Sequence, residues 1–500
     1  MTNTQKRSEG GHFSNLPMDI VFQILQHLDP LDIVAMRATC RSLHVATSER
    51  IVWLSVLDRI CERYGIFKPT FPFEEMSLAQ LEHAAFSSSR FVKTVQRFDP
   101  GPLGDNCAPV YQHRTIKSPR NADGKGRLFL IPGGRFLLTS GTEIRLWDLG
   151  HSSEPYHVKP RVIARTEDGS ALAAVCPSDD GKGLVVAATS SADRRSTLRI
   201  YEIDIQCNSP AFSKAAELAF DDIPHFSSLM NFHLTSSNIV IHCRTYFASW
   251  NWKERTGCKW PIGKEEISDL SIYGIDDTVI VFDNDNQFNI WDVPDHSQLS
   301  QPSSNDLANK PRRPKRFHRP AKTPALATHW NTIFSGTPVW QRHLPPYLCT
   351  MSVDGRTDDL QGNELALYSL QQHVKGASFM PMYTPVLQRK AKAVFSDYYE
   401  RVSELVSPLY QSGDHLVFCA SSSQSEATLV AAMPIPKEYS KEPIPISYMM
   451  LSDGLGGTFN HFITVHNGFC PMSGRLAYAR EGVDEIVILD YLPLFSDKRR

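Results

Sequence analysis

The first strongly apolar stretch of the chain is LPMDIVFQILQHL, residues 16–28, and its spacing predicts one short helix that begins at Pro17. Placing successive residues about 100° apart around the axis spreads the apolar side chains over an arc of about 200°. An ordinary surface helix buries a stripe of about 100°. One side of the arc can pack against the helix's own domain, and the other side needs a second neighbour in this chain or outside it.

A second helix is predicted directly afterwards, with Asp29 as its N-cap and Pro30 at its first position. Asp32 falls in the first turn, where a negative charge is favourable. This helix is also apolar on two sides. One face carries Leu31, Val34, Ala35 and Ala38, and the opposite side carries Ile33 and Met36.

Three more helical segments are expected before residue 100. Residues 39–48 form a short element, and ERIVWLSVLDRICERYG, residues 49–65, reads as a longer helix that ends at Gly65. Residues 77–98 form one further helix or two. The N-terminal fifth of the chain is therefore expected to be all-α.

These helices resemble a known family. From Leu16 to Trp53 the sequence is similar to the F-box: it has the Leu-Pro opening, the IL..L of the first helix, the L.P.D joint, the Thr-Cys-Arg of the third helix and the closing tryptophan. Leu43 departs from the pattern, since the family often has a tryptophan there. The resemblance implies docking onto the Skp-type adaptor of a cullin-RING ubiquitin ligase.

The resemblance also explains the surplus apolar surface, because one side of the helices would pack the F-box and the other would meet the adaptor. The alternative is a helical cap that packs only on the rest of its own chain. The residues expected to bind the adaptor are Leu16, Pro17, Ile20, Ile24, Leu25, Leu28, Leu31, Ile33 and Met36.

From about residue 100 the pattern changes to short β-type runs separated by Pro, Gly, Ser and Asp. Residues 131–149, 176–203 and 470–492 repeat one another as a turn, a strand, a second turn and a strand that ends in an aromatic or aliphatic residue and an acid. Residues 277–293 form a fourth such hairpin. A repeated β-hairpin is typical of a propeller or a solenoid.

Seven final strands can be aligned, and they resemble WD repeats. Two of them carry the Trp-Asp dipeptide itself, and we expect seven four-stranded blades, with a degenerate eighth left open. The tryptophans should fill space between blades, and the acids should anchor turns. The aligned positions are Trp147, Tyr201, Trp250, Trp291, Tyr368, Leu429 and Leu489.

Two features of the β region raise the question of a binding role. Arg145 and Arg199 occupy matching positions in two repeats, which is more typical of a solvated face than of a ligand site. Residues 297–325 are rich in Pro and Ser and then strongly basic, and are expected to form a disordered insert without a strand. Its PRRPKR run, residues 311–316, is compatible with a nuclear address or a weak phosphate contact, but equally with a solvated spacer.

Composition narrows the functional classes. The formal net charge of −2 gives no global attraction to nucleic acid or membrane. The ten scattered cysteines, without a C-x-x-C pair, indicate a reducing setting, and neither a signal peptide nor a membrane-spanning run is expected. Hydrolase, phosphate-loop and metalloprotease motifs are missing, and DNDNQF fails as a calcium loop because Phe288 and Pro294 replace its Gly and Glu. We expect no cofactor and no metal.

The sequence therefore predicts a multi-domain chain with a small all-α F-box followed by an all-β propeller of about seven blades. We expect a disordered N-terminus over residues 1–13, the F-box over 14–60, a helical linker over 61–99 and the propeller over 100–497. The function expected is a non-catalytic substrate receptor, cytoplasmic or nuclear, that binds a Skp-type adaptor, through it a cullin, and an unknown protein substrate. The alternatives are a propeller scaffold outside any ligase and a propeller enzyme or sugar-binding protein.

Overall fold

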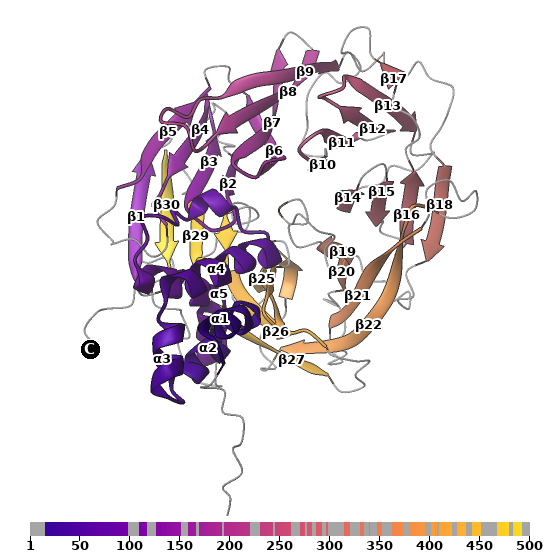
Figure 1. Cartoon of the computed structure of the whole chain (residues 1–500). Helices are drawn as coiled ribbons and strands as arrows, with labels where there is room; N and C mark the ends of the chain where they lie inside the picture. The colour runs from indigo at the N-terminus through magenta and orange to yellow at the C-terminus, as the bar shows by residue number, and fades with distance from the viewer. Residues whose placement is uncertain are drawn as a thin grey trace, which may run out of the picture.

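The chain folds as a group of helices packed against the rim of a closed ring of β-sheets (Figure 1). The structure is a computed structural model, and it describes residues 16–98, 110–117, 127–151, 159–166, 170–192, 195–220, 231–243, 246–261, 271–275, 278–282, 287–292, 297–298, 315–320, 331–334, 340, 348–352, 363–373, 381–395, 402–405, 407, 410–422, 428–436, 443–451, 468–479 and 484–492. The segment 1–13, expected to be disordered, lies outside these residues.

The helices begin and end where their local sequences predict. Asp29 is the N-cap of the second helix with Pro30 at its first position, and Gly65 ends the fourth helix in the left-handed conformation at φ 62°. Ser77 and Gln80 form a capping box that starts a single fifth helix. The helices are α1 (Met18–His27), α2 (Pro30–Arg37), α3 (Arg41–Thr47), α4 (Arg50–Tyr64) and α5 (Leu78–Arg97), with a 3₁₀ turn at Lys68–Thr70.

Trp53 lies at the centre of the helical core. Its ring is fully buried, its Nε1 donates to the carbonyl of Thr47 at 2.8 Å, and its centroid lies 5.5 Å from that of Phe86 on α5. The guanidinium of Arg37 lies over the same ring and pairs with Glu82 at 2.7 Å. One aromatic side chain therefore joins α2, α3, α4 and α5 into a single unit.

The ring has seven blades, as expected (Figure 1). Each blade is built on four strand positions from the centre outwards, with one strand added to the third blade and the inner position of the sixth divided between two strands. The first blade contains β2 (Leu128–Leu130), β3 (Phe136–Ser140), β4 (Ile144–Asp148) and β5 (Arg161–Arg165), and the second contains β6 (Ala171–Pro177), β7 (Gly183–Ala192), β8 (Arg195–Asp204) and β9 (Ser213–Phe220). The third contains β10 (Asn231–Leu234), β11 (Asn238–Cys243), β12 (Tyr246–Asn251) and β13 (Thr256–Pro261), with β17 (Ser297–Gln298) added outside. The fourth contains β14 (Ser271–Ile275), β15 (Thr278–Phe282), β16 (Gln287–Asp292) and β18 (Lys315–Pro320).

The fifth and sixth blades are joined into one sheet, because β22 pairs with β27 in parallel. The sixth blade has a divided inner strand, in which β23 and β24 both pair with β25. These blades contain β19 (Asn331–Phe334), β20 (Leu348–Ser352), β21 (Asn363–Gln372) and β22 (Tyr383–Phe395), then β23 (Val402–Leu405), β24 (Tyr410–Ser412), β25 (His415–Ser422), β26 (Thr428–Pro434) and β27 (Ile444–Met450).

The seventh blade closes the ring by combining the two ends of the β region. It contains β28 (Phe469–Cys470), β29 (Arg475–Ala479) and β30 (Glu485–Asp490) from the end of the chain, and β1 (Gln112–Lys117) from its start. The strands β1 and β30 pair antiparallel from Gln112↔Asp490 to Lys117↔Glu485. Closure of this kind joins the two ends of the β region through backbone pairing within one blade.

The seven aligned repeat positions all lie in the third strand of a blade, from Trp147 in β4 to Leu489 in β30. The expectation that these were the final strands is wrong, because each is followed by an outer strand or, in the seventh blade, is covered by β1. Outer strands such as β5 are largely exposed and so lack the repeated apolar signature.

The predicted insert at 297–325 is also partly corrected. Residues 297–298 pair with β13, and residues 315–320 pair with β16 over its whole length. The expectation of no strand in this segment is therefore wrong for β17 and β18, because backbone pairing along an outer edge needs no apolar pattern. The rest of the segment lies outside the described residues.

The helices are seated directly on the ring. On one side, Phe91 of α5 lies 5.7 Å from Phe469 of the seventh blade, centroid to centroid, inside a shared apolar core. On the other, the amide of Phe67 donates to the carbonyl of Pro132 in the first blade at 3.0 Å. A Cβ on Gly133 (φ 108°) would lie 2.6 Å from Thr70 Oγ1. The helices thus cover the point where the ring closes.

Candidate functional site

Of the two Trp-Asp acids, Asp148 has the structural role expected of it, and the side chain of Asp292 lies outside the described part of the structure. Asp148 accepts a hydrogen bond from the amide of Gly150 at 3.0 Å and pairs with Arg135 at 2.9 Å. Burial alone would raise the pKa of Asp148, but the hydrogen bond and charge of Arg135 outweigh it and hold that pKa below its usual range. Asp148 therefore anchors the turn after its strand.

Arg145 and Arg199 are paired within the chain. Arg145 forms an ion pair with Glu143, and Arg199 lies 3.2 Å from Glu217 and also contacts Ser170. Their positive charges are matched by neighbouring carboxylates on the same blades. These pairings agree with the expectation that the two arginines are not ligand residues.

The nine residues expected to bind an adaptor fall into three groups. Leu16, Pro17, Ile20 and Leu31 are exposed, and Leu31 has 47% of its surface accessible. Ile24, Leu28 and Met36 are half-buried. Leu25 and Ile33 are completely buried in the core of the helices themselves.

Leu25 and Ile33 were expected to contact the adaptor, and their burial corrects this expectation. Neither side chain can contact a partner unless the domain opens. The arc on α1 is wide enough for two neighbours, and periodicity does not tell which side packs inward. On α2 the outer face is the one with Leu31, Val34, Ala35 and Ala38.

Four further exposed apolar side chains on α1 to α4 were not among the residues expected to bind an adaptor. Nine large apolar side chains are exposed in the described part of the chain, and seven of them lie between residues 16 and 51. Exposed apolar surface concentrated in this way marks an interaction site. The four missed residues are Met18, Val34, Val45 and Ile51.

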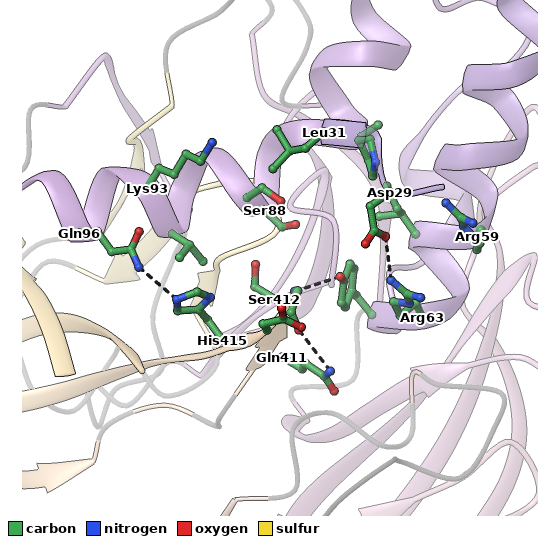
Figure 2. A pocket seen from close by; sticks show the side chains of 18 residues that line it. Asp29, Leu31, Arg59, Arg63, Ser88, Lys93, Gln96, Gln411, Ser412 and His415 are labelled. Carbon is green, nitrogen blue, oxygen red and sulfur yellow. Dashed lines mark hydrogen bonds and ion pairs between the residues drawn. The ribbon is translucent and has the colours of Figure 1, made fainter. Parts of the chain in front are cut away.

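A pocket of about 690 Å³ lies between the helices and the sixth blade (Figure 2). The helical wall comes from the start of α2, the end of α4 and the middle of α5, and the ring contributes the β24–β25 hairpin at residues 411–415. Its two walls are linked by Tyr64, whose hydroxyl accepts from the amide of Gly413 at 2.9 Å, and by Gln96, which lies 3.1 Å from the ring nitrogen Nε2 of His415.

The pocket is lined by more positively charged than negatively charged side chains. Arg59 and Arg63 lie one turn apart on α4, and Lys93 projects from α5 (Figure 2). Asp29 pairs with Arg63 at 3.1 Å, and Asp414 is exposed. Burial, and then the charge of Arg63, lower the pKa of Arg59.

Within the described residues, no group of three or more His, Cys, Asp or Glu side chains is arranged to hold a metal ion. No helix in this part of the chain is long and apolar enough to cross a membrane.

Comparisons with known proteins give one family match and several similar solved structures. Residues 13–59 match the F-box-like family, and no curated protein matches the chain. Similar solved structures include a chain of the Mitotic Checkpoint Complex (14% identity, 78% of this chain and 96% of that chain, TM-score 0.40). Others are the Cps50 (Swd1) β-propeller domain of Myceliophteria thermophila (11%, 75% and 98%, 0.40) and Sqt1 of Saccharomyces cerevisiae (11%, 76% and 84%, 0.34).

Proposed function

We propose that this chain, an F-box-like domain followed by a seven-blade β-propeller, is the substrate-recognition subunit of a Skp–cullin–F-box ubiquitin ligase. The observation that carries the proposal is the concentration of exposed apolar side chains on the F-box-like helices, at residues 16–51. Exposed apolar surface of this kind typically marks an interaction site, and the F-box resemblance suggests a Skp-type adaptor as the partner that would cover it.

The adaptor would contact the outer side of α1 and α2. Leu16, Pro17 and Ile20 present one exposed run at the start of the domain, and Leu31 and Val34 present another on α2. Ile24, Leu28 and Met36 are half-buried at the edge of this surface and would contribute less. Truncating a central interface residue typically costs about 2 kcal/mol or more of binding free energy.

The propeller would hold the protein substrate on one of its faces. Because α4 and α5 are packed into the same apolar cores as the first and seventh blades, the adaptor surface and the ring would keep one relative orientation. Catalysis would be by proximity: a substrate lysine is held near the conjugating enzyme brought by the cullin, which raises its effective concentration. The chain itself would supply no reacting group, and it would act in the cytoplasm or the nucleus.

The test is reconstitution. The full chain is purified with a Skp-type adaptor and analysed by size-exclusion chromatography, beside an Ile20→Glu variant. Ile20 is exposed, so the charge should abolish the complex without unfolding the helices. A wild-type chain that never elutes with the adaptor would overturn the proposal and favour a propeller scaffold that works outside any ligase.

A further inference from the structure

We infer that the pocket between the helices and the β24–β25 hairpin binds a small organic anion, a phosphate ester or a carboxylate. Its volume of about 690 Å³ lies within the range of roughly 300–1,000 Å³ that is typical of small-molecule sites. It shares only Leu31 with the exposed apolar surface proposed for the adaptor, and neither the F-box-like domain nor the ring forms it alone.

The charge of the lining favours an anion. Arg59, Arg63 and Lys93 bring three positive charges to the pocket, against the carboxylates of Asp29 and Asp414. Burial lowers the pKa of His415, so its imidazole adds no positive charge at neutral pH.

The three cations differ in how firmly they are held. Lys93 is exposed, and no ion pair joins it to a carboxylate among the residues described. The Arg63–Asp29 pair is more than half exposed on both sides, so it contributes little stability and can exchange partners at small cost. Arg59 is held in place by donating to the carbonyl of Leu28, which keeps its charge at the pocket.

The Ser412 side chain supplies the second, independent observation. Ser412 is 97% buried, it lines the pocket (Figure 2), and its Oγ has no hydrogen-bond partner in the described structure. A buried hydroxyl left without a partner costs about 1–3 kcal/mol, and Ser412 Oγ is the one such atom in the described structure that belongs to the lining of this pocket. A phosphate or carboxylate oxygen in the pocket would accept this hydroxyl's hydrogen bond.

A ligand in this place would touch both parts of the molecule. It would contact α2, α4 and α5 on one side and the hairpin of the sixth blade on the other, and so would hold the helices more firmly on the ring. Leu31 lines the pocket and also belongs to the proposed adaptor surface. On the proposed function, anion and adaptor would therefore influence each other's affinity reciprocally.

The test measures anion binding to the full chain without any adaptor, so its outcome does not depend on the ligase proposal. Glycerol 3-phosphate and citrate are titrated by isothermal calorimetry, with neutral glycerol as the matched control. We expect one or both anions to bind with a dissociation constant of about 1 mM or lower, and glycerol not to bind. Citrate and glycerol 3-phosphate separate the carboxylate from the phosphate source.

Three variants test whether the anion binds in this pocket. Ser412→Ala should weaken it about tenfold, the value of one lost charge-assisted hydrogen bond, while the melting temperature without ligand stays the same or rises. Lys93→Met should weaken it by a similar factor. Lys182→Met, at an exposed position in the second blade, should change nothing. Absence of binding by both anions, equal binding of glycerol, or wild-type affinity in both pocket variants would each overturn the inference.

Discussion

The guanidinium of Arg475 and the carboxylate of Asp490 form a buried ion pair across β29 and β30, with Nε 2.5 Å from Oδ1. The Nη1 of the same arginine donates to the carbonyls of Gly134 and Gly150 in the first blade. Asp490 also accepts from Arg114 of β1 at 2.9 Å. The Arg475–Asp490 pair therefore connects β29, β30 and β1 of the seventh blade with the first blade.

Replacing Arg475 by methionine should destabilise the protein strongly. The variant leaves the Asp490 carboxylate buried with one cation fewer, and two buried carbonyls lose a donor. Breaking a buried pair by removing one partner costs about 3–5 kcal/mol. Chemical denaturation should show this loss, whereas Arg161→Met, which removes a pair whose arginine side chain is 73% exposed, should cost about 1 kcal/mol or less. Equal stability of the two variants would contradict the role given to Arg475.

Ring closure makes a second prediction, for truncation. Removing residues 470–500 deletes β29 and β30, so β1 loses its only strand partner in the described structure. The faces of the sixth and first blades that pack against the seventh would then be exposed to water, and β1 would be left as an unpaired strand. We therefore expect the whole ring to lose its cooperative melting transition. Truncation after Leu492 keeps all four strands of the seventh blade and serves as the control. A soluble, cooperatively melting protein after the longer truncation would show that the ring does not depend on its last blade.

The buried His83 is expected to make the protein less stable as the pH falls. Burial first, and then the charges of Arg90 and His151, lower the pKa of His83 to about 3, and its Nδ1 accepts from the Arg90 guanidinium at 2.8 Å. In the unfolded chain a histidine titrates near about 6.5. The unfolded state therefore binds a proton first as pH falls, and the stabilisation present above pH 6.5 is lost between about 6.5 and 3.

The measurement is the unfolding free energy of wild type and His83→Gln between pH 7 and pH 5. In His83→Gln the unfolding free energy should change with pH less steeply than in wild type, by up to about 1.4 kcal/mol per pH unit. The reason is that the variant takes up one proton fewer on unfolding. The slope that remains would come from the other buried histidines, His151, His233 and His242, whose pKa values burial lowers to about 4. His113→Gln, at an exposed position on β1, is the control. An unchanged slope in His83→Gln would contradict this account.

The sequence predicted the seven blades because the third strand of each blade has the same neighbours. Trp147, Tyr201 and Trp250 are all buried between adjacent blades, so the same apolar alternation recurs. The outer strands could not be predicted in this way. β5 is largely exposed, and β18 pairs by its backbone, so neither needs a particular side-chain pattern.

The candidate sites were less predictable, for two physical reasons. Helical periodicity shows that α1 and α2 are apolar on two sides, but it does not show which side packs inward, and Leu25 and Ile33 were misplaced for that reason. The anion pocket gave no local signal at all. Its lining comes from residues 29–31, 59–64, 85–96 and 411–415, which only the closure of the ring against the helices brings together.

The exposed start of α1 makes the last prediction, which rests on the proposed function. Leu16 and Pro17 are both exposed, and the backbone carbonyl of Pro17, which accepts the first bonds of the helix, is kept when both residues become alanine. If each truncation costs about 2 kcal/mol of binding, the double variant should bind the adaptor several hundredfold more weakly, at about 1.4 kcal/mol per tenfold. Copurifying adaptor and cullin should disappear.

The matched control is Leu25→Ala, on the same helix but completely buried. It should lower the unfolding free energy of the helices by about 2–5 kcal/mol, whereas the double variant should keep the wild-type circular dichroism and melting curve. The two changes thus separate binding from folding along one helix. If the Leu16 and Pro17 double variant still retains the adaptor at wild-type levels, these two residues lie outside the interface. Loss of stability in that variant would instead mean that the start of α1 packs against its own chain.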